Sequence, residues 1–169
     1  MRIIYEKKGP SRFISNNYIG RIFERCLRRI SLPFEFSQGF NKRVKMSLGP
    51  PLAVGIEGNN EIIDVHVKNE NIPDKLIKES LNQILPEGLR IVECRYLTSK
   101  EKSPPKVNIA CYVIRIASNY DLAAIPDYWR VVYKGNDSLK IEVNTDRLSH
   151  KQLFSVFGTH NVIERFLIF

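Results

Sequence analysis

The stretch that sets the fold of this chain is residues 15–30, which read Ser15-Asn16-Asn17-Tyr18-Ile19-Gly20-Arg21-Ile22-Phe23-Glu24-Arg25-Cys26-Leu27-Arg28-Arg29-Ile30. Its apolar residues recur at intervals of three and four positions, which places them on one face of a helix: Ile19, Ile22, Phe23, Cys26, Leu27, Ile30. Ser15 precedes them and belongs to the residue types preferred at a helix N-cap. The sequence therefore predicts a helix with one buried face.

The segments around this helix predict a compact α+β unit. Before it, residues 2–8 read as a strand that stops at the turn dipeptide Gly9-Pro10. After it, the following elements are expected in order: a strand at 52–56, a turn at 57–60, a strand at 61–68, a helix at 73–85 and a strand at 89–97. The order strand, helix, strand, strand, helix, strand is that of a split βαβ, or ferredoxin-like, unit.

The rest of the chain repeats this order more weakly. Residues 98–106 are polar and contain two prolines, as expected of a linker. Beyond it we expect the following elements: a strand at 107–117, helical turns at 120–125, strands at 128–133 and 139–144, a helix at 148–157 and a strand at 162–169. The expected fold class is α+β, with tandem ferredoxin-like (βαββαβ) halves and antiparallel sheets. The predicted domains are residues 1–97 and 107–169.

Composition excludes several classes of protein. At 169 residues the chain can bury a core without metal or disulfide staples. Its 3 cysteines are an odd number at wide spacing, which fits neither a disulfide framework nor a CxxC-type metal site. The N-terminus lacks the apolar core of a signal peptide, and no run is long enough to cross a bilayer. We expect a cytoplasmic protein with no membrane contact.

The positive charge of the chain is concentrated in its first third. Residues 1–50 hold 11 Lys and Arg against 3 Asp and Glu, whereas residues 51–169 hold 15 of each, and the net charge is +8. A local excess of this kind is the electrostatic footprint of a protein that binds a polyanion. Nucleic acid is the leading expected partner, ahead of a small phosphorylated ligand.

Within this basic third, residues 37–45, which we call the basic loop, have the most unusual composition. They combine a glycine, an aromatic residue and three cations, and Gly49-Pro50-Pro51 follows as a rigid turn. The expected phosphate-binding residues lie in this loop, on the outer helix face and just before the helix: Arg12, Arg21, Arg25, Arg28, Gly39, Phe40, Asn41, Lys42, Arg43, Lys45. Two alternatives stay open. The helix cations form either a binding surface or a plain solvated face, and Phe40 either stacks on a base or anchors its own loop.

No catalytic or metal-binding motif stands out. The sequence contains no HExxH, P-loop or GxSxG pattern, and no carboxylate pair is marked out as acid and base. The 3 histidines are His66, His150 and His160, and the plain interpretation of each is a surface or turn residue. We expect no metal and no cofactor. If the protein is an enzyme, His66 is the only candidate for a general base.

Several short motifs resemble one known family: Gly9-Pro10-Ser11-Arg12-Phe13-Ile14-Ser15, Phe23-Glu24-Arg25-Cys26-Leu27-Arg28-Arg29, Leu32-Pro33, Ser37-Gln38-Gly39-Phe40-Asn41, and Lys45-Met46-Ser47-Leu48-Gly49-Pro50-Pro51-Leu52-Ala53-Val54-Gly55. They are similar to the radical-SAM-linked domain of unknown function, a bacterial family found beside or fused to radical-SAM proteins. The resemblance covers residues 1 to about 95. It implies a cytoplasmic protein with a radical-SAM partner, in RNA or cofactor modification. Relatives carry histidines where this chain has Asn16 and Arg43, so a reaction that depends on them is absent here.

Three functional hypotheses follow. The first is a non-catalytic RNA-binding accessory module, with tRNA as one RNA to test, that works with a radical-SAM partner and holds RNA phosphates on the residues named above. The second is a metal-independent endoribonuclease of the tandem ferredoxin-like type, an analogy of fold alone. The third is a module whose basic surface docks an acidic protein. The sequence leaves the oligomeric state open.

Overall fold

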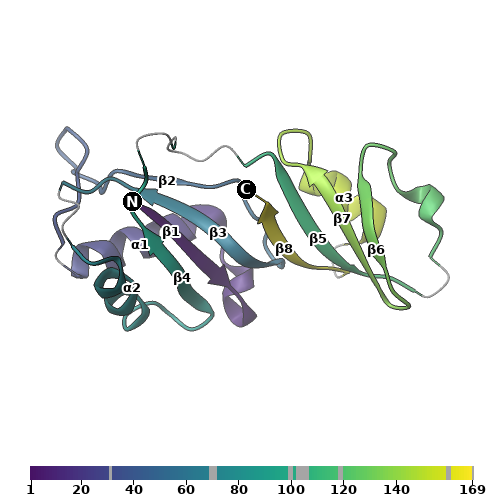
Figure 1. The fold of residues 1–169 in the computed structure, drawn as a ribbon, viewed down its shortest axis with the longest axis horizontal. Coiled ribbons are helices and arrows are strands. Elements are labelled where there is room, and N and C mark those ends of the chain that lie inside the picture. The colour runs from purple at the N-terminus through teal and green to yellow at the C-terminus, as the bar shows by residue number, and fades with distance from the viewer. Residues whose placement is uncertain are drawn as a thin grey trace.

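The computed structural model describes residues 1–30, 32–68, 72–98, 101, 107–117, 120–158 and 161–168. Within them lie eight strands, three α-helices and two short 3-10 segments: β1 Arg2–Lys7, η1 Gly9–Phe13, α1 Asn16–Arg29, β2 Met46–Leu48, β3 Glu57–Val65, α2 Asp74–Asn82, β4 Leu89–Arg95, β5 Ile109–Arg115, η2 Leu122–Ala124, β6 Arg130–Lys134, β7 Ser138–Asn144, α3 His150–Phe157 and β8 Val162–Ile168. The strands form one open sheet in the order β4-β1-β3-β8-β5-β7-β6, with β2 also paired to β3 (Figure 1). The expected mixed α+β class is confirmed.

The predicted first helix is present as α1. Ser15 is its N-cap, and the Ser15 hydroxyl oxygen accepts a hydrogen bond from the Tyr18 backbone N–H at 3.3 Å. Ile19, Phe23 and Leu27 are buried on one face, as their spacing predicts. The Phe23 ring contacts the ring of Tyr5 on β1, with centroids 4.9 Å apart. This face therefore fixes α1 against the sheet.

The first half of the sheet is built from β1 to β4. β1 pairs antiparallel with β3 and with β4, and β2 pairs antiparallel with β3, so the strand order here is β4-β1-β3-β2. α1 and α2 cover one face of these strands (Figure 1). Ile3, Ile63 and Ile91 of the sheet and Ile77 and Leu81 of α2 are all buried in a single core.

The second half repeats the strand order with less helix. β5 pairs antiparallel with β7 and with β8, and β6 pairs with β7, which gives β8-β5-β7-β6. α3 packs on this half through Leu153 and Phe157. The helical turns expected at 120–125 reduce to the three-residue η2. The tandem ferredoxin-like arrangement and the predicted domain boundaries remain predictions.

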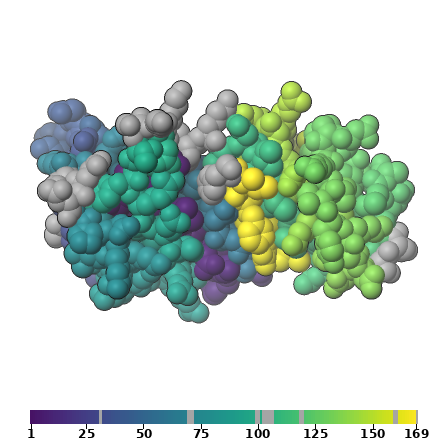
Figure 2. All heavy atoms as spheres, in the orientation of Figure 1, coloured from purple at the N-terminus to yellow at the C-terminus, as the bar shows by residue number. Residues whose placement is uncertain are grey.

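The two halves meet where β3 pairs with β8. Figure 2 shows the C-terminal residues of β8 in yellow between the two halves. Residues 57–60, predicted as a turn, instead begin β3. The turn prediction is wrong because the two asparagine amides pair with β8: Asn60 receives a hydrogen bond from the Leu167 N–H and donates one to the Leu167 carbonyl, both at 2.7 Å. Asn59 donates to Glu164 at 3.0 Å. Tertiary contacts here override the local turn preference.

The strand predicted at 52–56 is also wrong. The strand in this region is β2, at Met46–Leu48, and residues 49–56 form an irregular segment that we call the strap. Proline has no N–H to donate to a sheet, so Pro50 and Pro51 end the pairing of β2 with β3. Leu52 and Ile56 of the strap are buried in the core of the second half. The strap thus links the basic loop to the other half of the molecule.

The predicted linker is only partly described. Residues 99, 100 and 102–106 lie outside the described residues. Glu101 is described, and its carboxylate accepts hydrogen bonds from Arg95 at 2.7 and 2.9 Å. Across the described ranges, no helix has the length and apolar character needed to span a bilayer.

Candidate nucleic-acid interface

The basic loop is the tip of a narrow hairpin. At its base, Phe36 and Val44 form an antiparallel bridge, and the Ser37 N–H donates to the Arg43 carbonyl at 2.7 Å. The Arg43 N–H in turn donates to the Ser37 hydroxyl at 3.0 Å. Gly39 turns the chain with φ of 111°, a value that side-chain-bearing residues rarely adopt. The loop is therefore a defined structure that projects from the body.

Phe40 stands at this tip with its side chain fully exposed. The apolar anchors of the hairpin are instead Phe34 and Val44, which are both buried in the first core. The alternative in which Phe40 folds back to anchor its own loop is thus wrong. Its neighbour Asn41 is exposed as well.

Glu24 fastens the loop to α1. The Arg43 guanidinium donates to the Glu24 carboxylate from Nε at 3.0 Å and from Nη2 at 2.6 Å, and Arg28 donates to the same carboxylate at 3.1 Å. Arg28 also donates to the Lys42 carbonyl. The hydrogen bonds from Arg43 and Arg28 lower the pKa of Glu24, so it is a carboxylate at neutral pH. Glu24 therefore holds Arg28 of the helix and Arg43 of the loop side by side.

Three lysines surround a shallow hollow beside the loop. Lys42 and Lys45 come from the hairpin, and Lys68 follows the end of β3. The hollow has a volume of about 430 Å³ and is also lined by Glu35, Phe36, Ser37 and Gln38. Lys45 forms an ion pair with Glu35 at 3.0 Å, whereas no ion pair of Lys42 or Lys68 occurs within the described ranges. The Glu35 carboxylate also lies at the hollow, and Lys45, with smaller contributions from His66 and Lys68, lowers its pKa. Three lysines against one carboxylate leave the hollow with an excess of positive charge that can attract an anion.

Lys68 was not among the predicted site residues. Its position in a predicted alternating strand, on the same face as His66, was the signal that points to it. Lys68 lies more than twenty positions after the basic loop in the sequence, so the sequence did not indicate that the two are neighbours. The Lys68 N–H donates to the Pro33 carbonyl at 2.8 Å, and this backbone contact brings the end of β3 to the hairpin.

The helix arginines divide into two groups. Arg28 forms an ion pair with Glu24, whereas Arg21 and Arg25 are exposed on α1. Arg21 lines a second hollow of about 380 Å³ together with Glu24 and Arg43. This hollow continues the positive surface from the loop along α1.

Arg12 lies elsewhere. Its guanidinium is 3.9 Å from the Glu57 carboxylate and sits over the Phe13 ring at 4.8 Å. Glu57 begins β3, whereas the basic loop is attached near the end of that strand. Eight residue steps at about 3.3 Å separate the two ends of β3, on the order of 25 Å. The structure therefore does not bring Arg12 together with the other predicted residues.

The histidines occupy different settings. His66 is exposed, and its backbone N–H donates to the Lys45 carbonyl at 3.0 Å, so the two residues lie on adjacent backbone segments. His150 is half-buried, with Nε2 3.3 Å from the Tyr112 hydroxyl, and burial together with Arg165 lowers its pKa. His150 is the first residue of α3 and is only partly exposed. His160 lies outside the described residues. No cluster of three metal-ligating side chains occurs in the part of the chain that the structure describes.

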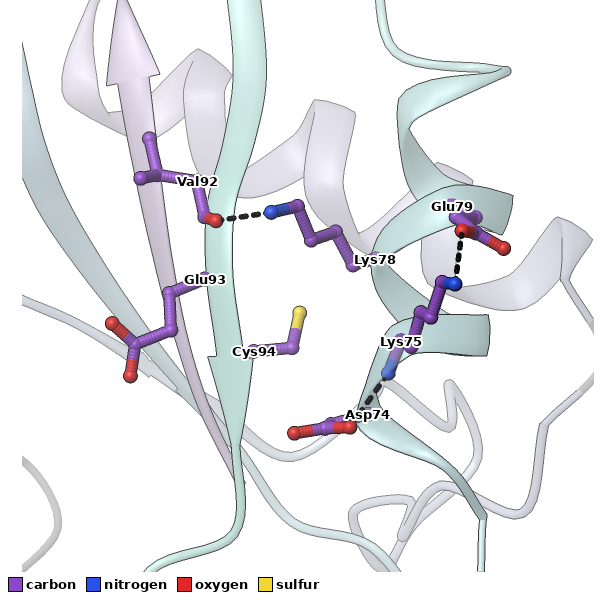
Figure 3. A pocket seen from close by; sticks show the side chains of 7 residues that line it. All are labelled: Asp74, Lys75, Lys78, Glu79, Val92, Glu93 and Cys94. Carbon is purple, nitrogen blue, oxygen red and sulfur yellow. Dashed lines mark hydrogen bonds and ion pairs between the residues drawn. The ribbon is translucent and has the colours of Figure 1, made fainter.

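A third hollow lies between α2 and β4 and carries mixed charge (Figure 3). Lys78 donates to the Val92 carbonyl at 2.5 Å, and the Cys94 sulfur points between the two elements. Burial, helped by Asp74, raises the pKa of the Cys94 thiol to about 12. A thiol that stays protonated at neutral pH is a poor nucleophile, so Cys94 is not poised for nucleophilic attack.

Comparison with known families gives one result. A family model described as "Uncharacterized protein conserved in bacteria (DUF2344)" matches residues 1–156. The match extends past residue 95, where the resemblance of the short motifs ends. The expected domain of unknown function is confirmed, while the radical-SAM link stays a prediction. No curated protein matches the chain.

Proposed function

This chain belongs to the uncharacterized bacterial family DUF2344, and we propose that it is a non-catalytic RNA-binding accessory module that works with a radical-SAM partner in the cytoplasm. The description of the family names no activity, so the proposal rests on the chemistry of the site. The proposed ligand, RNA, follows from the charge pattern, and the proposed radical-SAM partner follows from the resemblance of the motifs.

The observation that carries the proposal is a cluster of cations from two elements, α1 and the basic loop, which Glu24 joins. Glu24 joins α1 to the basic loop through Arg28 and Arg43, and Lys42, Lys45 and Lys68 stand around the neighbouring hollow with Glu35 as its one acidic lining residue. Phosphate contacts supply most of the affinity of such surfaces, because binding releases the counterions of the nucleic acid. Several separated cations suit a backbone of repeated phosphates better than a single small anion.

We also propose that the chain folds as two ferredoxin-like units. The strand orders β4-β1-β3-β2 and β8-β5-β7-β6 are equivalent, and both are antiparallel within the unit, which supports this proposal. The first unit carries the cationic surface, and its sheet continues directly into the second unit. The second unit also holds the strap, which follows the basic loop, because Leu52 and Ile56 of the strap are buried in its core.

Replacing Lys42 and Lys68 together with glutamate is expected to weaken RNA binding about 10- to 100-fold at 150 mM salt. Each substitution removes a cation that contacts a phosphate and adds a negative charge that repels it. Electrophoretic titration of a tRNA at several salt concentrations measures the effect. The slope of log affinity against log salt is expected to become shallower in the variant.

The matched control replaces Lys75 and Lys151 with glutamate. Both are exposed lysines on helices away from the basic loop, and the change in net charge is the same. The control is expected to retain most of the affinity. An equal loss in both variants, or wild-type binding that does not respond to salt, contradicts the proposal. Capture of an acidic protein without RNA affinity supports the docking alternative instead.

A second candidate function is a metal-independent endoribonuclease with His66 as general base. The observation in its favour is that a backbone hydrogen bond joins exposed His66 to Lys45, one of the lysines that line the hollow. Under this hypothesis, structured RNA incubated with the protein in EDTA gives discrete fragments, and His66→Ala abolishes them. Intact RNA after prolonged incubation with the wild-type protein contradicts the hypothesis and leaves the accessory function in place.

A further inference from the structure

We infer that the RNA segment bound by the basic loop is unpaired, with one base stacked on the Phe40 ring and an adjoining phosphate held at the lysine hollow. This inference rests on the proposed function and makes it more specific. It assigns a selectivity for single strands to one side chain at the tip of the hairpin.

The setting of Phe40 is the first step. Its ring is fully exposed, although the hairpin is anchored by other apolar residues. Exposure of a whole aromatic side chain is unfavourable in water, so the loop keeps Phe40 at its tip against the hydrophobic effect. A free aromatic face among cations is the arrangement that binds single-stranded nucleic acid, because every base has a face that can stack.

The neighbourhood of Phe40 is the second step. Lys42 follows two positions later and lines the hollow that Lys45 and Lys68 complete. The hollow is polar and open, and its volume of about 430 Å³ lies within the range of small-ligand sites. A base and its own phosphate are neighbours in every nucleotide. The ring and the lysines therefore suit the two chemically different parts of one nucleotide.

The geometry of duplex RNA is the third step. In an A-form helix the bases are paired and stacked inside, and the major groove is too deep and narrow for side chains to reach them. The ring of Phe40 then contributes nothing to binding, while the cations still bind the phosphates of either form. Selectivity for unpaired RNA must therefore depend on Phe40 and not on the lysines.

The test compares fluorescently labelled oligouridine of 12 nucleotides with an RNA duplex of equal total charge, by anisotropy at 150 mM salt. Phe40→Ala is expected to weaken binding of the single strand about 5- to 100-fold, and to leave duplex binding unchanged. Phe40→Trp, which keeps a stacking face, is expected to retain the affinity. Phe13→Ala removes another exposed phenylalanine, beside Arg12 at the far end of the sheet, and is expected to change neither affinity.

The outcomes separate the two proposals. If the wild-type protein binds both RNAs and Phe40→Ala changes neither affinity, or lowers both equally, the inference is overturned and the proposed function stands. If the wild-type protein binds neither RNA, the proposed function fails and the inference falls with it. Binding to vesicles of anionic lipid in place of RNA, lost in Phe40→Ala, also overturns both.

Discussion

Replacing Arg165 with methionine is expected to lower the free energy of unfolding by about 3–5 kcal/mol. The Arg165 side chain is 1% exposed, and it donates to Glu61 from Nε at 3.0 Å and again from Nη2. Methionine fills a similar volume but leaves the Glu61 carboxylate buried without its partner. A buried carboxylate that has lost such a partner is far more costly than the pair, and the nearby Lys7 ammonium, which makes no hydrogen bond, offsets only part of its desolvation.

Arg165 also holds the strap. Its guanidinium donates to the carbonyl of Pro51 at 2.7 Å and to that of Pro50 at 2.8 Å. These carbonyls belong to irregular backbone with no strand partner, so Arg165 satisfies acceptors that the sheet does not. Its loss is therefore expected to loosen the strap as well as the pair.

Urea unfolding followed by the fluorescence of Trp129, which is the only tryptophan and is buried, measures the effect. The matched control is Arg130→Met, because Arg130 also pairs with a glutamate, Glu142 at 3.4 Å, but its side chain is 79% exposed. Exposed ion pairs contribute little, so this variant is expected to change stability by less than about 1 kcal/mol. Adding Glu61→Leu to Arg165→Met is expected to restore much of the loss. A cost for Arg165→Met as small as that of the control shows that the buried pair is not important.

Replacing Lys7 with methionine is expected to stabilise the protein at pH 7 by about 3 kcal/mol. The Lys7 side chain is 2% exposed, and its Nζ has no hydrogen-bond partner among the described residues. Burial, opposed by nearby Glu61, lowers the pKa of Lys7 to about 8. A buried ammonium without hydrogen bonds is unfavourable, and methionine has a similar length without the charge.

The stability gained by Lys7→Met depends on pH through the titration of Lys7. Below pH 8 both the folded and the unfolded protein carry the Lys7 proton, so the full cost of burying the charge is present. Between pH 8 and about 10.5 the unfolded chain binds more protons than the folded one, and the stability of the wild-type protein rises with pH. The advantage of Lys7→Met is therefore expected to be constant below pH 8 and to shrink above it.

Unfolding curves of both proteins at pH 6, 7, 9 and 10 test this expectation. Other groups titrate in the same range, including Tyr5, whose pKa is raised by burial, but they are common to both proteins and cancel in the difference. Lys8→Met is the control, because Lys8 is partly exposed and pairs with Glu6 at 2.9 Å. A stability difference that does not vary with pH, or a destabilised Lys7→Met, argues against a strained buried charge.

The sequence by itself determined the elements whose signal is local. The spacing of Ile19, Phe23 and Leu27 predicted α1, and similar periodicity predicted α2, α3 and most strands, because helices and half-buried strands repeat over a few residues. It also placed the excess charge in the first third and indicated the basic loop. These signals depend only on neighbours along the chain.

Only the tertiary structure decided what those residues contact. It showed Asn60 paired to β8 across 107 positions, and Arg165 bound to Glu61 across 104. In the same way it placed Arg12 far from the loop. No local pattern encodes such pairs, because each side chain exchanges water for a partner that only folding brings near. The basic loop was visible in the sequence, but its exposed aromatic tip and the third lysine were fixed by packing at the end of β3.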